Sequence, residues 1–344
     1  MKKNFYNNLT EEIISNKEVY IITITKAKNE ELVGKKILRC NDELIFEEEI
    51  NIEFYKNVIN LIDFNSYGKI LVLDDDTEVF VEQIIPKPQL VICGGGHVAL
   101  DLCSVGKMLD FNVTVIDDRK EFANESRFNI ADKVICKSFE EALSEVNGNN
   151  SYFVIVTRGH RDDRKCLEII LNKNHKYVGM IGSKGKVAMV RSKLIQEGYT
   201  KEELNKVHTP VGLNIGAETP AEIAISIAAE IISIKNEGDK PSYIDYNILN
   251  TIKDDSRNKV LVSILNKKGS SPRGVGAKML VFEDGDFMGT IGGGSVENAA
   301  YEKALDLIKK QKSCVEVYDL SNSKAATLGM ACGGKITVLF EYIN

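Results

Sequence analysis

Residues 90–99 read Leu90-Val91-Ile92-Cys93-Gly94-Gly95-Gly96-His97-Val98-Ala99, and this stretch decides the fold. Its four apolar residues predict a buried strand, and the G-x-G-x-x-A run after them predicts a tight turn into a helix. Such glycines let the backbone approach a pyrophosphate, whose charge is favoured at a helix N-terminus. Gly94 and Gly96 are therefore candidate nucleotide contacts. The alternative is a Rossmann-like turn without a ligand, and His97 is either a ligand contact or a polar residue of the first helical turn.

The surroundings of this turn supply the context that a lone glycine motif lacks. Asp117 ends the next predicted strand, about 20 residues after the glycines, where an acid contacts a ribose hydroxyl in dinucleotide-binding folds. Further short, β-branched runs predict buried parallel strands. The five expected strands are Gln89–Cys93, Val113–Asp117, Lys133–Cys136, Tyr152–Thr157 and Tyr177–Ile181. Helical stretches lie between them, so we expect a doubly wound α/β sheet that binds a nucleotide or dinucleotide.

Two more loops follow predicted strands and should lie at the same carboxyl edge of the sheet, where ligands bind in such folds. They are Thr157-Arg158-Gly159-His160 and Gly182-Ser183-Lys184-Gly185-Lys186. Arg158, His160 and Ser183 are the candidate contacts that they offer. For His160 an acid–base role, a phosphate contact and an ordinary surface histidine are all open.

Helix starts in this region have structural explanations. Asp162 and Asp163 are expected to be first-turn acids that face a helix dipole. Thr219-Pro220-Ala221-Glu222 predicts a capping box with proline at the first helical position.

Two breaks divide the chain. Ile85-Pro86-Lys87-Pro88 is extended, because each proline keeps its predecessor out of the helical region, and Asn236–Pro241 is polar and turn-rich. We therefore expect an N-terminal segment 1–87, a Rossmann-like nucleotide-binding domain 88–238 and a glycine-rich domain 239–344.

The two outer segments share a pattern. Val19–Ile24 matches Val260–Leu265, and Val33-Gly34-Lys35-Lys36 matches Val275-Gly276-Ala277-Lys278. We interpret these smaller α/β segments as a divergent internal duplication. The alternative is two unrelated segments with similar patterning.

Glycine-rich loops in 239–344 indicate a ligand site. Gly269–Lys278 combines glycines, hydroxyls, Arg273 and Lys278, and exposed amides beside such cations make an anion-binding concavity. Thr290–Glu297 places three glycines before a helix expected to run to about Gln311, with Ser295 as its N-cap. Tight turns of a small domain are the alternative explanation. The candidate contacts are Ser270, Ser271, Arg273, Lys278, Gly292, Gly293, Gly294, Ser295 and Glu297.

The seven cysteines show no C-x-x-C or Cys/His clustering, which argues against a disulfide framework and against a structural zinc site, and we expect no metal ligands. Cys332 lies between glycines, where a thiol is sterically open and a positive potential favours the thiolate. It is the candidate catalytic residue. Cys93, Cys103, Cys136 and Cys166 fall on predicted strands or helices and are expected to be core or structural thiols.

Composition excludes several classes of function. With 344 residues, 43% of them hydrophobic and 27% charged, the chain can form two or three folded domains. A net charge of -6 without a basic block gives no reason to expect nucleic acid as a partner. The most apolar helical stretch, Ala221–Ile234, contains two glutamates and is too short to span a bilayer, and the N-terminus lacks a secretory signal. We expect a cytoplasmic protein with reduced thiols and no membrane partner.

These motifs resemble the XdhC/CoxI family over about Pro88 to Ile343. Its glycine-rich domain is matched by S-S-P-R-G-V-G-A-K-M-L (270–280), I-G-G-G-S-V-E (291–297) and C-G-G (332–334). Its Rossmann-like domain is matched by G-G-G-H-V-A (94–99), V-I-D-D-R (115–119), T-R-G-H (157–160), G-M-I-G-S-K (179–184) and N-I-G-A-E-T-P-A-E-I-A (214–224). The resemblance implies an accessory factor that binds molybdenum cofactor (molybdopterin), assists its sulfuration and delivers it to a xanthine dehydrogenase-type hydroxylase.

The resemblance also implies partners and shows two departures. The implied partners are the hydroxylase apoenzyme, a sulfur donor such as a cysteine desulfurase and, as one option, a second copy of the chain. Family members commonly place the glycine-rich domain before the Rossmann domain, whereas here it follows. Ser295 stands where the family usually has cysteine, so any activity that needs that cysteine either rests here on Cys332 or is lost. The N-terminal segment keeps Val33–Lys36 but neither the triple glycine nor C-G-G, which suggests a worn copy with a scaffolding role.

Two other functions are compatible with the residues alone. The Gly94 turn and Asp117 permit an NAD(P)-dependent oxidoreductase, although no convincing proton-transfer pair accompanies them. A docking protein that binds a nucleotide without catalysis is the second. Whether the chain is itself an enzyme is open.

Overall fold

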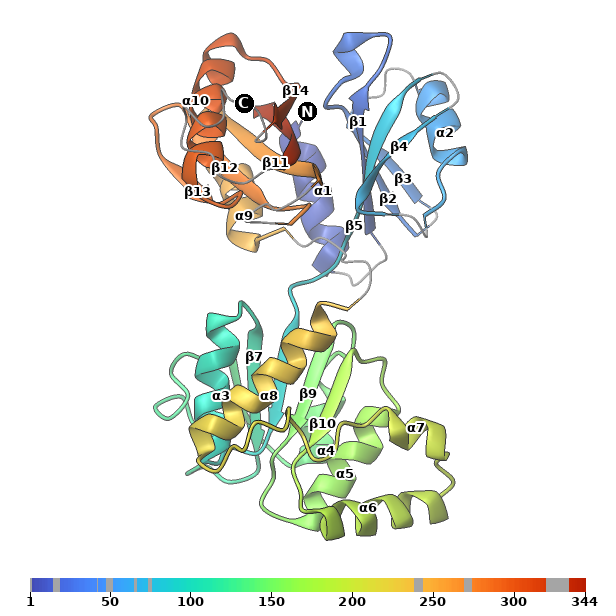
Figure 1. Ribbon diagram of the computed structural model, residues 1–344, viewed down its shortest axis with the longest axis vertical. Coiled ribbons are helices and arrows are strands. Elements are labelled where there is room, and N and C mark those ends of the chain that lie inside the picture. Colours follow the sequence, from blue (N-terminus) through green and yellow to red (C-terminus); the bar gives the residue numbers. More distant parts are fainter. Residues whose placement is uncertain are drawn as a thin grey trace. The chain divides into compact units, whose positions relative to one another are not determined.

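The computed structural model describes residues 2–14, 19–41, 43–47, 52–64, 67–73, 76–237, 244–268, 274–319 and 334–344. The chain divides into two compact units. One unit is formed by Lys87–Gly238, and the other joins Met1–Pro86 to Asp239–Asn344. In Figure 1 the first unit is teal to gold and the second carries both the blue and the red ends of the chain.

The Lys87–Gly238 unit is built on a five-stranded parallel sheet with the order β10-β9-β6-β7-β8. Its strands are β6 (Gln89–Cys93), β7 (Asn112–Asp117), β8 (Lys133–Cys136), β9 (Ser151–Ile155) and β10 (Tyr177–Met180). All five predicted strands form, and the α/β class is confirmed. Near-continuous burial along β6 and β9 explains why their sequences are apolar without alternation.

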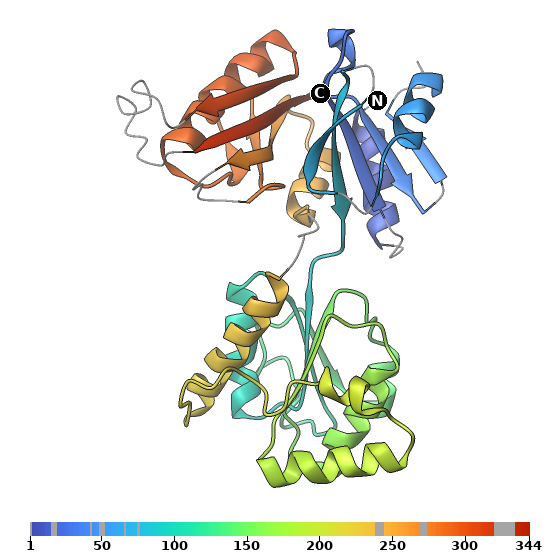
Figure 2. The same ribbon diagram turned by 45° about the vertical axis from the view of Figure 1, so that its right-hand side comes forward.

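Helices cover both faces of this sheet (Figures 1 and 2). They are α3 (His97–Met108), α4 (Phe139–Ser144), α5 (His160–Leu171), α6 (Lys184–Gln196), α7 (Lys201–Asn205) and α8 (Pro220–Lys235). One buried cluster lies between the sheet and α3 with α8, and another lies on the opposite face with α4, α5 and α6. The predicted capping box is confirmed, because Thr219 accepts the Glu222 amide and Glu222 accepts the Thr219 amide.

The second unit contains two antiparallel sheets with the same strand order, β3-β2-β1-β5-β4 and β13-β12-β11-β15-β14. The N-terminal half consists of α1 (Lys2–Ile14), β1 (Val19–Lys26), η1 (Glu30–Leu32), β2 (Lys36–Cys40), β3 (Glu43–Phe46), α2 (Ile52–Asn60), β4 (Lys69–Val72) and β5 (Glu78–Ile84). The C-terminal half consists of α9 (Tyr246–Asp254), β11 (Lys259–Lys268), β12 (Lys278–Phe282), β13 (Phe287–Gly289), α10 (Gly294–Lys310), β14 (Cys314–Asp319) and β15 (Lys335–Ile343).

The correspondence between the halves extends to irregularities. The β1–β5 ladder shifts register after Ile24, and the β11–β15 ladder shifts after Ile264. The Gly34 amide donates to the Ile24 carbonyl at 2.8 Å, as the Gly276 amide does to the Ile264 carbonyl at 2.9 Å. Both glycines have left-handed φ values, 85° and 84°, which a residue with a Cβ adopts only with strain. Shared defects of this kind support the internal duplication.

The two halves also share one core. A single cluster of buried residues joins α1 and the first sheet to α9 and the second sheet. Phe5, Leu9 and Ile21 lie in it together with Leu249 and Leu280. Each half also has a buried cluster of its own, but complete burial of one such side chain contributes about 1.5–3 kcal/mol, so the shared cluster stabilises the two halves against each other.

No helix within the described ranges combines the length and apolar character needed to cross a lipid bilayer.

Candidate functional site

The first candidate site is the glycine turn after β6. A Cβ on Gly94, which has φ 114°, would lie 2.5 Å from the Val156 carbonyl oxygen, and one on Gly95 would lie 2.3 Å from that of Phe122. Gly96 differs, because a Cβ there would meet no described heavy atom within 4 Å. The first two glycines are thus required by packing within the protein, whereas Gly96 leaves space at the start of α3.

Asp117, at the end of β7, holds this turn in place. Its carboxylate accepts the Gly95 amide at 2.8 Å and two guanidinium N–H groups of Arg119 at 2.9 Å. Burial alone would raise the pKa of this carboxyl, but the hydrogen bonds from Arg119 and Gly95 outweigh it and lower the pKa below its usual value. We expected Asp117 to contact a ribose. In the structure it is 1% exposed and its carboxylate is occupied by the protein's own donors.

Two neighbours complete the arrangement around Gly95. The Arg127 Nε donates to the Gly95 carbonyl at 3.2 Å, and the Arg119 guanidinium stacks on the Phe122 ring at 3.8 Å. Asp118, which follows Asp117, has a side chain that is 57% exposed. The carboxylate that faces solvent at this strand end is therefore that of Asp118. The spacing of about 20 residues after the glycines had pointed to Asp117 instead.

The second candidate site is the loop after β9, where α5 begins. Gly159 is the N-cap of α5, and a Cβ on it would also meet no described heavy atom within 4 Å. Neither Gly96 nor Gly159 provides a side-chain hydrogen bond to its helix. Both helices consist of 12 residues, so their first-turn amides and aligned dipoles favour an anion.

The two helices follow neighbouring strands of the sheet, α3 after β6 and α5 after β9. Cys93 and Ile155, the last residues of β6 and β9, are paired in parallel register, and the Val156 amide donates to the Cys93 carbonyl at 2.8 Å. From β6 the chain proceeds through α3 to β7 on one side, while β9 lies on the other side. This reversal is the topological switch point, where open α/β sheets bind their ligands beyond the strand ends.

A buried ion pair links the loops after β9 and β10. Asp163 is 0% exposed, accepts the Thr157 hydroxyl at 2.6 Å and pairs with the Lys186 ammonium of α6. Asp163 does lie in the first turn of α5, as expected, but its burial and partners make it a connector between loops. No local sequence signal identifies a partner on another helix.

The remaining predicted contacts of this unit are at the surface. His97 and Arg158 are exposed, at the start of α3 and just before α5. Ser183 is exposed and its hydroxyl accepts the Lys186 amide at 3.4 Å as the N-cap of α6. His160 begins α5, and its side chain lies outside the described part of the structure.

In the other unit, the loop before α10 wraps around a carboxylate of its own chain. Glu297 Oε2 accepts the amides of Ile291, Gly292 and Gly293 at 3.0, 3.3 and 3.1 Å, and it also accepts the Thr290 hydroxyl. Burial would raise the pKa of Glu297, but these hydrogen bonds lower it overall. The backbone amides of this glycine loop therefore do bind an anion, which is the carboxylate of Glu297 in the same chain.

Two predictions for the glycine-rich half need correction. Ser295 is not the N-cap of α10, because the N-cap is Gly293 with φ 73° and the helix begins at Gly294. Lys278 does not point its ammonium toward a ligand loop. It is buried and pairs with Glu82 of the N-terminal half at 2.8 Å, where the ion pair compensates the cost of burying its charge. A Cβ on Gly293 or Gly294 would meet no described heavy atom within 4 Å.

The thiols divide as expected with one exception. Cys93, Cys103 and Cys166 are buried, whereas Cys136 lies on the predicted strand β8 but is exposed at its end, so it is not a core thiol. Ser270, Ser271, Arg273 and Cys332 lie outside the described residues. Within those residues, no group of three or more His, Cys, Asp or Glu side chains is placed to hold a metal ion.

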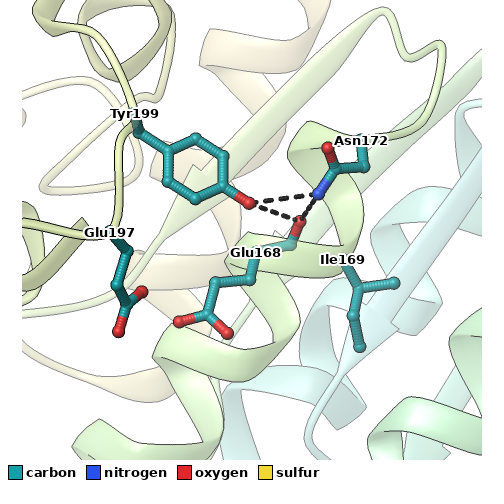
Figure 3. Close-up of a pocket in the computed structure, with 5 residues that line it drawn as sticks. All are labelled: Glu168, Ile169, Asn172, Glu197 and Tyr199. Carbon is teal, nitrogen blue, oxygen red and sulfur yellow. Dashed lines mark hydrogen bonds between the residues drawn. The ribbon is translucent and has the colours of Figure 1, made fainter. Parts of the chain in front are cut away.

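A separate pocket of ≈ 380 Å³ lies beside α5 and is shown in Figure 3. Its lining residues are Glu168, Ile169, Asn172, Glu197 and Tyr199. The Asn172 amide donates to the Glu168 carbonyl at 2.7 Å and to the Tyr199 hydroxyl at 3.0 Å. Burial and the adjacent Glu197 raise the pKa of Glu168. The Asn172 amide, the Glu168 carbonyl and the Tyr199 hydroxyl are hydrogen-bonded to one another. The pocket shares no residue with the glycine turns.

Fold and geometry thus define a doubly wound domain with two glycine-capped helix starts at its switch point, and a second unit of two similar halves, of which the C-terminal one carries a glycine loop. Residues 90–231 match the family described as the XdhC Rossmann domain, and residues 253–319 match the XdhC and CoxI family. The chain belongs to the XdhC and CoxI family.

Relatives of known description agree with this membership. The chain is 33% identical over 163 residues to a probable xanthine dehydrogenase subunit of Bacillus subtilis (strain 168), covering 47% of each protein. It is 34% identical over 85 residues to the molybdenum cofactor insertion chaperone PaoD of Escherichia coli (strain K12), covering 25% of this chain and 26% of PaoD. The chain spans about half or less of the curated relatives it matches.

A solved structure shows the same fold. The crystal structure of a xanthine dehydrogenase from Bacillus halodurans aligns with a TM-score of 0.52 at 23% identity, over 66% of this chain and 65% of that chain.

Proposed function

We propose that this protein is an accessory factor that binds molybdenum cofactor, assists its sulfuration and delivers it to a xanthine dehydrogenase-type hydroxylase. Family membership gives the class. The observation that carries the binding step is the pair of glycine-started helices, α3 and α5, at the switch point of the sheet. Sulfuration and delivery rest on the relatives and on the resemblance.

The chemistry of the site fits a phosphorylated cofactor. Gly96 and Gly159 leave room for a phosphate to approach, and the first-turn amides of α3 and α5 are suitable donors. His97 and Arg158 are exposed beside them and can add side-chain contacts. Molybdopterin carries a phosphate, or a pyrophosphate in its dinucleotide form, and when bound it supplies the molybdenum that the hydroxylase needs.

The residues of the chain act here by holding and orienting. Asp117 and Arg127 fix both polar groups of Gly95, so the turn is formed before a ligand arrives. Asp163, tied to Thr157 and Lys186, fixes the loop before α5 to α6 in the same way. A preformed site loses less conformational entropy on binding, which strengthens affinity.

The glycine-rich half is proposed to contribute the second part of the function. A ligand phosphate at the loop before α10 would contact the open side of Gly293 and Gly294 or replace the Glu297 carboxylate. Cys332 is proposed to take part in sulfur transfer from a donor such as a cysteine desulfurase. A second copy of the chain and the hydroxylase apoenzyme are the further proposed partners.

Two alternatives predict different bound molecules. An NAD(P)-dependent oxidoreductase would use the same switch point, and Asp118 would offer its exposed carboxylate to the ribose. A docking protein would bind a nucleotide without chemistry.

The test is to identify what co-purifies with the full-length protein. The protein is denatured, and the supernatant is examined by fluorescence and mass spectrometry. A pterin supports the proposal. A nicotinamide dinucleotide in stoichiometric amount supports the oxidoreductase alternative and overturns the proposal of an accessory factor.

A further inference from the structure

Two buried ion pairs join the halves of the duplicated unit in a reciprocal manner. Lys278 of the C-terminal half pairs with Glu82 of the N-terminal half at 2.8 Å, and Lys36 of the N-terminal half pairs with Glu341 of the C-terminal half at 2.9 Å. None of the four side chains is more than 6% exposed.

The four residues occupy equivalent positions. Lys36 lies opposite Thr23 on β1, as Lys278 lies opposite Ser263 on β11. Glu82 lies opposite Ile21, as Glu341 lies opposite Leu261. Each half therefore supplies one lysine and one glutamate to a symmetric interface. Buried pairs of this kind are poor sources of net stability, and their best-attested use is to specify one arrangement.

Only one of the two lysines, Lys278, is connected to a glycine loop by hydrogen bonds. The Lys278 carbonyl accepts the Thr290 amide at 3.1 Å, and the Thr290 hydroxyl donates to Glu297, which holds the amides of Gly292 and Gly293. The Gly289 turn packs on the same carbonyl, because a Cβ on Gly289 would lie 2.6 Å from it.

In the N-terminal half the equivalent lysine carbonyl, that of Lys36, accepts an amide that does not belong to a glycine loop. The Lys36 carbonyl accepts the Glu47 amide at 3.2 Å, and the Glu47 carboxylate accepts the Lys36 amide at 3.1 Å. The sequence that follows, 48–51, contains no glycine. The framework is thus shared, and only the C-terminal half has a glycine loop attached to it.

We propose that Glu82 is a positioning residue for the glycine loop 290–293, so that the N-terminal half holds the loop of the C-terminal half through the Glu82–Lys278 ion pair. The contacts run from Glu82 to the Lys278 ammonium, and from the Lys278 carbonyl through Thr290 to Glu297. An N-terminal half without its own glycine loop thereby has a defined role. That the loop contacts a ligand rests on the proposed function, whereas its positioning by Glu82 does not.

The reciprocal pair provides a matched control. Glu82→Gln removes the ion-pair partner of Lys278, and Glu341→Gln makes the same change to the ion-pair partner of Lys36, whose ammonium also donates to the Thr23 hydroxyl at 3.3 Å. Glu341 lies in the C-terminal half itself and also accepts the Tyr6 hydroxyl at 2.8 Å. A merely structural role therefore predicts that Glu341→Gln disturbs the C-terminal half at least as much.

The test is amide hydrogen exchange of Gly292 and Gly293 in the full chain without ligand. We expect on the order of tenfold faster exchange in Glu82→Gln, equivalent to about 1.4 kcal/mol in local opening, and no comparable change in Glu341→Gln when both are referred to their global stability. Glu82→Asp, which keeps the charge, should recover part of the protection and serves if Glu82→Gln does not fold. Equal effects of the two glutamine variants, or none, overturn the proposal.

A second measurement separates this inference from the proposed function. Isolated molybdopterin is titrated into wild type and Glu82→Gln. Faster loop exchange together with weaker binding supports both ideas. Faster loop exchange with unchanged affinity leaves the positioning role intact and refutes the use of this loop by the cofactor.

Discussion

Replacing Gly96 by serine should raise the stability of the protein and lower its affinity for its ligand. Gly96 is the N-cap of α3, with φ -70° and ψ -168°, and serine adopts this conformation without strain. A Cβ there meets no described atom, so the substitution causes no clash. The serine hydroxyl would accept an amide of the first turn, which is the group that a ligand phosphate is proposed to use.

The two effects can be estimated separately. Serine is preferred to glycine at an N-cap by a few tenths of a kcal/mol, and removing the freedom of glycine in the unfolded chain adds about 0.4–1 kcal/mol. A gain of about 1 kcal/mol corresponds to a rise in Tm of roughly 2–4 °C for a domain of this size. Loss of one charge-assisted hydrogen bond costs about 1.5–3 kcal/mol, or roughly a tenfold to more than hundredfold weaker Kd.

Thermal unfolding and titration of isolated molybdopterin, with NAD⁺ as a second probe, measure these effects. Thr200→Gly removes the N-cap of α7, which begins at Lys201 and follows no strand, so it should reduce stability slightly and leave affinity unchanged. Gly95→Ala should reduce stability, because its Cβ would lie 2.3 Å from the Phe122 carbonyl oxygen. A Gly96→Ser protein with a higher Tm and wild-type affinity for both probes would refute a ligand contact at the start of α3.

Three further outcomes follow from the glycine-rich half. Arg273→Ala should weaken binding of isolated molybdopterin by roughly tenfold to a hundredfold through loss of one charge-assisted contact, and unchanged affinity by titration would contradict that role. Cys332→Ser should abolish activation of a client hydroxylase in a maturation assay, while full activation would leave the protein a carrier only. Glu297→Gln should destabilise the protein at neutral pH, because the lowered pKa of Glu297 stabilises the fold when the carboxyl is ionised. That contribution is present above the unfolded pKa of about 4.3 and is lost as the pH falls through the folded pKa, so the difference in unfolding free energy from wild type should narrow in acid. A difference in unfolding free energy between wild type and Glu297→Gln that does not change with pH would refute this role of the ionised carboxylate.

Sequence pattern alone determined the secondary structure and class of the middle domain. Five short β-branched runs separated by helical stretches can bury their apolar surface only as a covered parallel sheet, and five strands form at those positions. The sequence also predicted the glycine turn after β6 and the Thr219 capping box, since a turn or helix start depends on a few adjacent residues, but not the close approach of Gly94 to Val156 and of Gly95 to Phe122. The repeated pattern of the outer segments likewise indicated their common architecture.

Tertiary structure decided what the polar side chains do. Asp117 lies where an acid was expected, but the Gly95 amide and Arg119 occupy it. Lys278 stands beside a glycine-rich loop in the sequence, yet its ammonium is buried against Glu82, a residue on the other half of the duplicated unit. Hydrophobic periodicity is a property of neighbouring residues, whereas the partner of a charge is whichever opposite charge or donor the folded chain brings within hydrogen-bond reach. Residues far apart in the sequence supply that partner, so no local pattern contains it.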